Sequence, residues 1–108
     1  MIKNRSIYVP QHPSELRDLL SSMLLQSPTF LDKIGYFPDQ SIDSVFFELN
    51  EGLLACRTKL GQHRYEAMRA LSDQMRAHFD ADPEDVNGRT AAGQKLILEM
   101  MEMLKTKR

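Results

Sequence analysis

The sequence has a single cysteine, no long apolar run and almost no excess of charge of either sign. Its 108 residues include 14 basic and 15 acidic side chains, which leave a formal net charge of −1. Cys56 has no second cysteine to pair with, so an internal disulfide is excluded and a reducing compartment is favoured. No apolar stretch approaches the roughly 20 residues that a membrane span requires, so we expect no membrane partner.

The first residues of the sequence show no secretory signal. Lys3 and Arg5 are basic, but the apolar segment of a signal peptide does not follow them. Together with the lone cysteine, this pattern predicts a cytoplasmic protein. The length suffices for one modest core, and residues 1–108 are therefore expected to form a single domain.

Apolar residues recur at helical spacing in four parts of the chain. The 41–60 segment has an apolar seam at alternating steps of three and four, a spacing typical of helices that pack at shallow angles, and its residues are Phe46, Leu49, Leu53, Cys56 and Leu60. The fold class is therefore predicted to be all-α, a small bundle of about four helices with an extended N-terminal arm. The four predicted helices span residues 13–26, 41–60, 62–79 and 89–106.

Two segments lie outside these helices. Residues 1–12 include the β-prone Ile7-Tyr8-Val9, and they are expected to form the extended arm. Residues 29–40 are expected to contain one helical turn built on Phe30, Leu31 and Ile34 and ended by Gly35. The aromatic pair Tyr36-Phe37 that follows is predicted to be a packing plug, with binding of a partner as the alternative.

An acidic loop, residues 80–88, separates the last two predicted helices. It contains four carboxylates and no basic residue, while Pro83 and Gly88 prevent a helix from continuing through it. Charge, loop character and expected exposure coincide only here. The candidate partner-binding residues are therefore Asp80, Asp82, Glu84 and Asp85. The same carboxylates could instead only solvate the connection and cap the next helix, and both interpretations stay open.

The acidic loop does not match a calcium-binding pattern. An EF-hand loop requires oxygen ligands at positions one, three and five, glycine at the sixth and glutamate at the twelfth. Aligning Gly88 with the sixth position places Pro83 first and Gln94 twelfth, and neither matches. The histidines also lack the spacing of a zinc site, so we expect no metal and no cofactor. They are His12, His63 and His78.

The sequence carries no reaction signature. Cys56 falls on the apolar seam of the 41–60 helix, where a buried structural thiol is expected instead of a nucleophile. No P-loop, G-x-G-x-x-G or G-x-S-x-G pattern occurs. We therefore predict that the protein is not an enzyme and has no catalytic residues.

Nucleic-acid binding is a minor alternative, because a tight turn at Gly61 separates two predicted helices. The second of these helices carries arginines that could contact phosphates, but carboxylates alternate with them and would repel a nucleic-acid backbone. The arginines are Arg64, Arg69 and Arg76, and the carboxylates are Glu66 and Asp73. We expect no nucleic-acid partner.

Three stretches in the second half of the chain can be compared with known proteins. They are Phe46-Phe47-Glu48-Leu49-Asn50-Glu51-Gly52-Leu53, Leu71-Ser72-Asp73-Gln74-Met75-Arg76-Ala77-His78-Phe79 and Asp82-Pro83-Glu84-Asp85. They resemble small bacterial proteins, including immunity proteins encoded beside polymorphic or contact-dependent toxins, and the likeness covers roughly residues 44–104. The resemblance implies tight binding of one cognate toxin domain, and it assigns no role to any single residue.

The leading hypothesis is therefore a non-catalytic immunity protein that binds a toxin partner and acts as a monomer or homodimer. Many toxins that attack nucleic acids are basic, and an acidic loop would speed association by charge complementarity. The alternative is a structural or regulatory helical module that homodimerises. Its exposed apolar strip would include Phe47, Leu54 and Met101.

Overall fold

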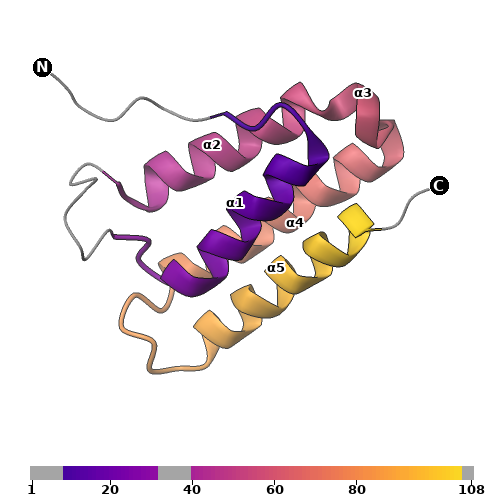
Figure 1. The fold of residues 1–108 in the computed structure, drawn as a ribbon. Helices are drawn as coiled ribbons and strands as arrows, with labels where there is room; N and C mark the ends of the chain where they lie inside the picture. Colours follow the sequence, from indigo (N-terminus) through magenta and orange to yellow (C-terminus); the bar gives the residue numbers. More distant parts are fainter. Residues whose placement is uncertain (1–8, 32–39, 106–108) are drawn as a thin grey trace, which may run out of the picture.

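The computed structural model of the chain describes residues 9–31 and 40–105. This described part is built from helices and contains no strand, which confirms the predicted all-α fold class (Figure 1). The helices are α1 (Pro13–Gln26), α2 (Ile42–Ala55), α3 (Arg57–Leu60), α4 (Gln62–Asp80) and α5 (Arg89–Lys105).

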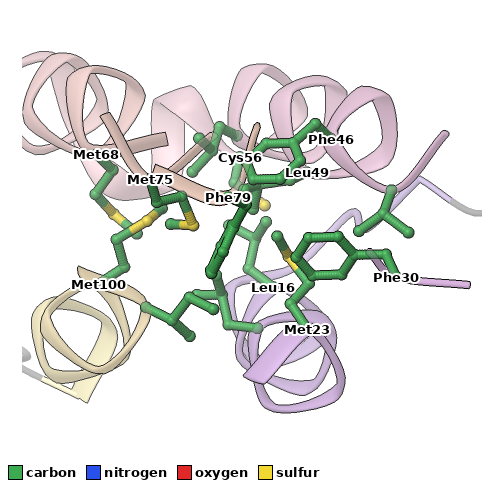
Figure 2. Close-up of a cluster of buried hydrophobic side chains, with 14 of the residues drawn as sticks. Leu16, Met23, Phe30, Phe46, Leu49, Cys56, Met68, Met75, Phe79 and Met100 are labelled. Carbon is green, nitrogen blue, oxygen red and sulfur yellow. The ribbon is translucent and has the colours of Figure 1, made fainter. Parts of the chain in front are cut away.

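The four long helices form a bundle with one helix at each corner (Figure 2). α1 packs against α2 and α5, and α4 packs against the same two helices. α1 is therefore diagonal to α4, and α2 is diagonal to α5. The α4–α5 contact is the most extensive of these.

Three phenylalanines pack edge-on inside the bundle, at the end that includes the acidic loop. The ring centroid of Phe30 lies 5.8 Å from that of Phe46 and 5.2 Å from that of Phe79. Edge-to-face contacts of this kind add to the stabilisation from buried area. Methionines fill the core toward α5, among them Met68, Met75 and Met100 (Figure 2).

Side-chain hydrogen bonds are made at the starts of α1 and α2. Pro13 opens α1, and the Glu15 carboxylate accepts a hydrogen bond of 2.7 Å from the backbone N–H of Gln11. Ser41 caps α2 through a reciprocal pair with Ser44, in which each hydroxyl accepts the other residue's backbone N–H. The Ser41–Ser44 pair satisfies backbone donors that a helix leaves without partners at its start, and the Glu15 contact ties the residue before the N-cap His12 to the first turn of α1.

The 41–60 segment is two helices and not the single one predicted. α2 ends at Ala55, and Cys56 (φ −93°, ψ 4°) redirects the chain into the single turn of α3. The predicted seam is nevertheless kept. Its residues Phe46, Leu49, Leu53, Cys56 and Leu60 are all buried. The bend has no proline or glycine at its centre, so packing of Cys56 and Leu60 into the core is the force that accounts for it.

The other boundaries differ less. α1 spans the same residues as the predicted first helix, and α4 continues one residue further than predicted, to Asp80. α5 starts at Arg89 as predicted and runs to Lys105, while Thr106 lies outside the described residues.

Of the predicted arm, residues 1–8 lie outside the described part, and residues 9–12 are not helical. Pro10 is buried against α2, where a Cβ added to Gly52 would lie 2.9 Å from Pro10 Cδ and 3.0 Å from Leu16 Cδ2. Any side chain at Gly52 would therefore collide with the arm and with α1. The glycine allows these two segments to lie directly on α2.

The helical turn predicted from Phe30, Leu31 and Ile34 does not include Phe30 and Leu31, because neither residue is helical, while Ile34 and Gly35 lie outside the described residues. Phe30 has a positive φ of 62°, and its buried ring packs against Phe46 and Phe79. Burial of the ring outweighs the helical preference of the local sequence. The predicted aromatic plug Tyr36-Phe37 lies outside the described residues.

Candidate functional site

Asp82 organises the acidic loop from the inside. Its side chain is only 1% exposed. One carboxylate oxygen accepts the backbone N–H of Val86 at 2.8 Å and of Asn87 at 3.3 Å, and the other accepts the N–H of Thr90 at 3.0 Å. The Thr90 hydroxyl also donates to the Asp82 carbonyl at 3.2 Å. The loop is thus folded around one carboxylate.

The ionised form of Asp82 is favoured in this position. Burial alone would raise its pKa, but the hydrogen bonds from Val86, Thr90 and Asn87 outweigh it, and the net pKa is lowered. The charge also lies at the N-terminal end of α5, where the helix dipole stabilises an anion. Asp82 is therefore not placed to contact a partner, contrary to the expectation from the sequence. It is buried, and its carboxylate caps α5 by accepting hydrogen bonds from backbone N–H groups.

The other three candidates are on the surface. Glu84 and Asp85 are exposed, and Asp85 has a positive φ of 57°. Asp80 is also exposed, and its carboxylate lies 3.4 Å from Arg76 Nε. Arg76 is paired a second time, with Asp43 of α2. The structure therefore brings Asp43 to the same surface as the predicted acidic residues.

Asn87 fixes the second half of the loop. Its side-chain amide donates to the Ala81 carbonyl at 3.1 Å, and its side-chain oxygen accepts the backbone N–H of Arg89 at 3.0 Å. Together with Asp82, Asn87 joins the end of α4 to the start of α5. Both ends of the loop are thereby held, and Glu84 and Asp85 project from a fixed backbone.

An apolar pocket of about 210 Å³ lies beside the acidic loop. The ends of α1 and α4, the start of α2 and the loop itself meet at this end of the bundle (Figure 1). The lining residues are Pro28, Thr29, Leu31, Ser41, Ile42, Phe79, Asp80 and Pro83. Pockets for drug-sized ligands are about 300–1,000 Å³, so this one is sized for a single large side chain.

One carboxylate lies in the lining of this pocket, and three more belong to residues that follow lining residues in the sequence. Asp80 is in its wall, Asp43 follows the lining residue Ile42, and Glu84 and Asp85 follow the lining residue Pro83. We call these four residues the acidic rim. Arg76 is the cation that pairs with two of them, so the rim keeps a negative balance. The arrangement suits a cationic partner surface that carries an apolar group.

Cys56 and the residues of the predicted apolar strip are not part of the acidic rim or the pocket lining. Cys56 is buried, and burial raises the pKa of its thiol, which disfavours the reactive thiolate. Phe47 and Leu54 are 50% and 47% exposed on α2, while Met101 is half-buried on the diagonal helix α5. The strip predicted from these three residues is therefore not continuous.

The arginines of the nucleic-acid alternative all bond within the chain. Arg69 pairs with Asp73 at 2.6 Å, and Arg76 pairs with Asp43 and Asp80. Arg64 donates to the backbone carbonyls of Leu60 and Met103, at the ends of α3 and α5. These contacts disfavour phosphate binding by the three side chains.

Within residues 9–31 and 40–105, no cluster of three histidine, cysteine or acidic side chains has the geometry to hold a metal ion. None of the helices described there is both long and apolar enough to cross a membrane. Comparisons with models of protein families, with curated proteins and with solved structures gave no match to this chain.

Sequence reasoning missed the pocket. Its lining comes from three separate segments of the sequence, and no single segment carries a recognisable signal. The exposed Leu31 lies between α1 and α2, and the half-buried Ile42 is the first residue of α2; apolar residues at such positions are common in any bundle. Only the folded arrangement shows that they share a cavity.

Proposed function

We propose that this chain is a non-catalytic binding protein that neutralises a bacterial toxin in the cytoplasm by binding to it. The observation that carries the proposal is the acidic rim, of which Glu84 and Asp85 lie on the loop that is folded around Asp82. A preorganised surface loses little conformational freedom on binding, so more of the interaction energy appears as affinity.

The charge of the rim supports a basic partner. Toxin domains that attack nucleic acids present basic surfaces, and opposite charges speed diffusional encounter. The Debye length is about 10 Å at 0.1 M salt, so such steering weakens as salt rises. Binding over the toxin's active site or substrate groove would block its activity without any chemical step by this chain.

The test reverses charge on the rim without disturbing its support. Glu84→Lys combined with Asp85→Asn changes the charge by three, and asparagine tolerates the positive φ at position 85. Asp82 is left intact. The matched control is Asp18→Lys with Glu99→Gln, which makes the same charge change at two exposed helical positions.

The probe is the C-terminal domain of the protein encoded by the adjacent reading frame, and association is followed by stopped-flow fluorescence. We expect the rim variant to associate at least about tenfold more slowly at 20 mM salt, with the difference lost near 500 mM. The control should match the unmodified chain. Equal association rates for the two variants, or no binding of the domain by the unmodified chain, would contradict the proposal.

A second candidate function, homodimerisation, is favoured by one observation. Phe47 and Leu54 lie seven residues apart on the same side of α2, and both are about half exposed. Light scattering from about 5 to 500 µM separates the candidates. A dimer that Phe47→Asp converts to a monomer supports this second function, and a monomer at every concentration removes it.

A further inference from the structure

We propose that the pocket beside the acidic rim receives one apolar side chain from a partner protein segment in which lysines or arginines flank that side chain. The inference rests on the proposed function, since the partner it describes is the protein that the chain binds. It adds the chemistry by which the segment is recognised.

The lining of the pocket sets the central residue of the segment. Leu31, Ile42 and Phe79 supply apolar walls, and Leu31 is 53% exposed. Covering this surface with an aliphatic or aromatic group removes apolar area from water on both sides. The 210 Å³ cavity accommodates one leucine or phenylalanine side chain, and a drug-sized molecule exceeds it.

The acidic rim sets the flanking residues. Asp80 lies in the wall of the pocket, and Glu84 and Asp85 stand next to the lining residue Pro83. Residues before and after an anchor lie within a few ångströms of the pocket mouth, where lysine or arginine would meet these carboxylates. An uncharged apolar molecule would leave the rim unused, so we commit to a basic protein segment.

Three lining residues of the pocket are held by contacts within the chain, before any partner arrives. Ser41 belongs to the reciprocal cap of α2, and Phe79 is fixed among the core rings. Pro83 directly follows Asp82, whose carboxylate holds the loop. A pocket with fixed walls around one anchor is the usual form of a hot spot in protein interfaces.

The experiment uses synthetic peptides and the full chain with labelled methyl groups. The reference peptide has nine residues, with a central leucine, two lysines on each side and glycine elsewhere. One comparison peptide replaces the leucine with alanine, and another replaces the lysines with glutamates. Binding is measured from the NMR shifts of the Leu31 and Ile42 methyl groups, with peptide up to about 10 mM.

We expect saturable shifts with the leucine peptide and about tenfold weaker binding of the alanine peptide, since a few buried methylene equivalents are lost. The glutamate peptide should give no shifts. Leu31→Ala should weaken the leucine peptide by a similar factor. Leu25→Ala removes the same atoms from a leucine that is 86% exposed and outside the pocket lining, and it should change nothing.

Equal binding of the leucine and alanine peptides, equal effects of Leu31→Ala and Leu25→Ala, or no saturable shift would each overturn the inference. The proposed function would then still be decided by the toxin domain and the rim variant. Conversely, leucine-dependent peptide binding combined with unchanged toxin association in the rim variant would uphold the pocket and reject the proposed function.

Discussion

The α3–α4 turn and the α4–α5 connection join helices by opposite means. The turn is one residue, Gly61, whose backbone angles (φ 88°, ψ 150°) reverse the chain, and beyond its two neighbours in the chain no residue comes within 4 Å of where a Cβ would be. The longer connection is folded by a buried side chain, the carboxylate of Asp82. A glycine needs only conformational freedom here, whereas Asp82 needs three backbone donors placed around it.

This difference decides which connection can carry function. The turn at Gly61 is too short to present side chains. The connection after α4 places one acidic residue inside as support and leaves Glu84 and Asp85 exposed, where the proposed partner would contact them. Residues of the same charge therefore have different surroundings within four positions of each other.

Loss of the Asp82 carboxylate should break the longer connection, and this is the largest effect we expect. Asp82→Ala leaves the N–H groups of Val86, Asn87 and Thr90 without their acceptor, so the variant should unfold at a markedly lower Tm. Hydrogen exchange of these three amides should rise together. Glu84→Ala serves as the control and should leave both measurements unchanged; a normal Tm for Asp82→Ala would refute the role given to this residue.

The stability of the chain should also depend on pH through Asp82. Because the pKa of Asp82 is lowered in the folded state, its stabilising contribution is complete above about pH 4 and is lost as the pH falls through the lower folded value. Thermal unfolding from pH 7 to pH 2 should therefore show a steeper acid loss for the unmodified chain than for Asp82→Asn. Parallel curves for the two proteins would contradict the lowered pKa.

A side chain at Gly61 should destabilise the short turn, by less free energy than the loss of the Asp82 carboxylate. Gly61→Ala meets no neighbouring atom, so only backbone strain is introduced. Residues held in such a glycine-only conformation cost about 1–3 kcal/mol. Chemical denaturation should show a lower midpoint with an unchanged slope. A midpoint equal to that of the unmodified chain would mean that alanine is accommodated there without strain.

The smallest effect should come from the exposed half of the longer connection. Glu84→Gln combined with Asp85→Asn removes two surface charges and no bond to the loop backbone. The free energy of unfolding should change by no more than about 0.5 kcal/mol, while association with a basic partner should slow. A large loss of stability in this double variant would show that Glu84 and Asp85 also support the loop, a role given above to Asp82 and not to them.

Helical periodicity predicted most of the fold because it reports which face of each helix is buried. Phe46, Leu49 and Leu53 were identified as inward from spacing alone. The bend at Cys56 was not predicted, since no glycine or proline stands there and the bend results from packing between helices. The positive φ of Phe30 has the same kind of cause, because contacts with Phe46 and Phe79 decide it.

The candidate site could be predicted only in part. Counting charges locates the acidic loop, but it does not distinguish Asp82 from Glu84 and Asp85. One local signal does single out Asp82: it precedes Pro83, and Asp-Pro pairs favour the start of a turn. The pocket could not be found in this way, because the contacts that form it depend on how the helices are arranged.

The seating of Pro10 on Gly52 couples two positions that are 42 residues apart in the sequence. Glycine inside a helix costs about 1 kcal/mol relative to alanine, and the pyrrolidine ring occupies the space that this glycine leaves. Substitution of either residue alone is therefore constrained by the other. In homologous chains, a larger residue at the position of Gly52 should occur together with loss of the proline, so the two positions should covary.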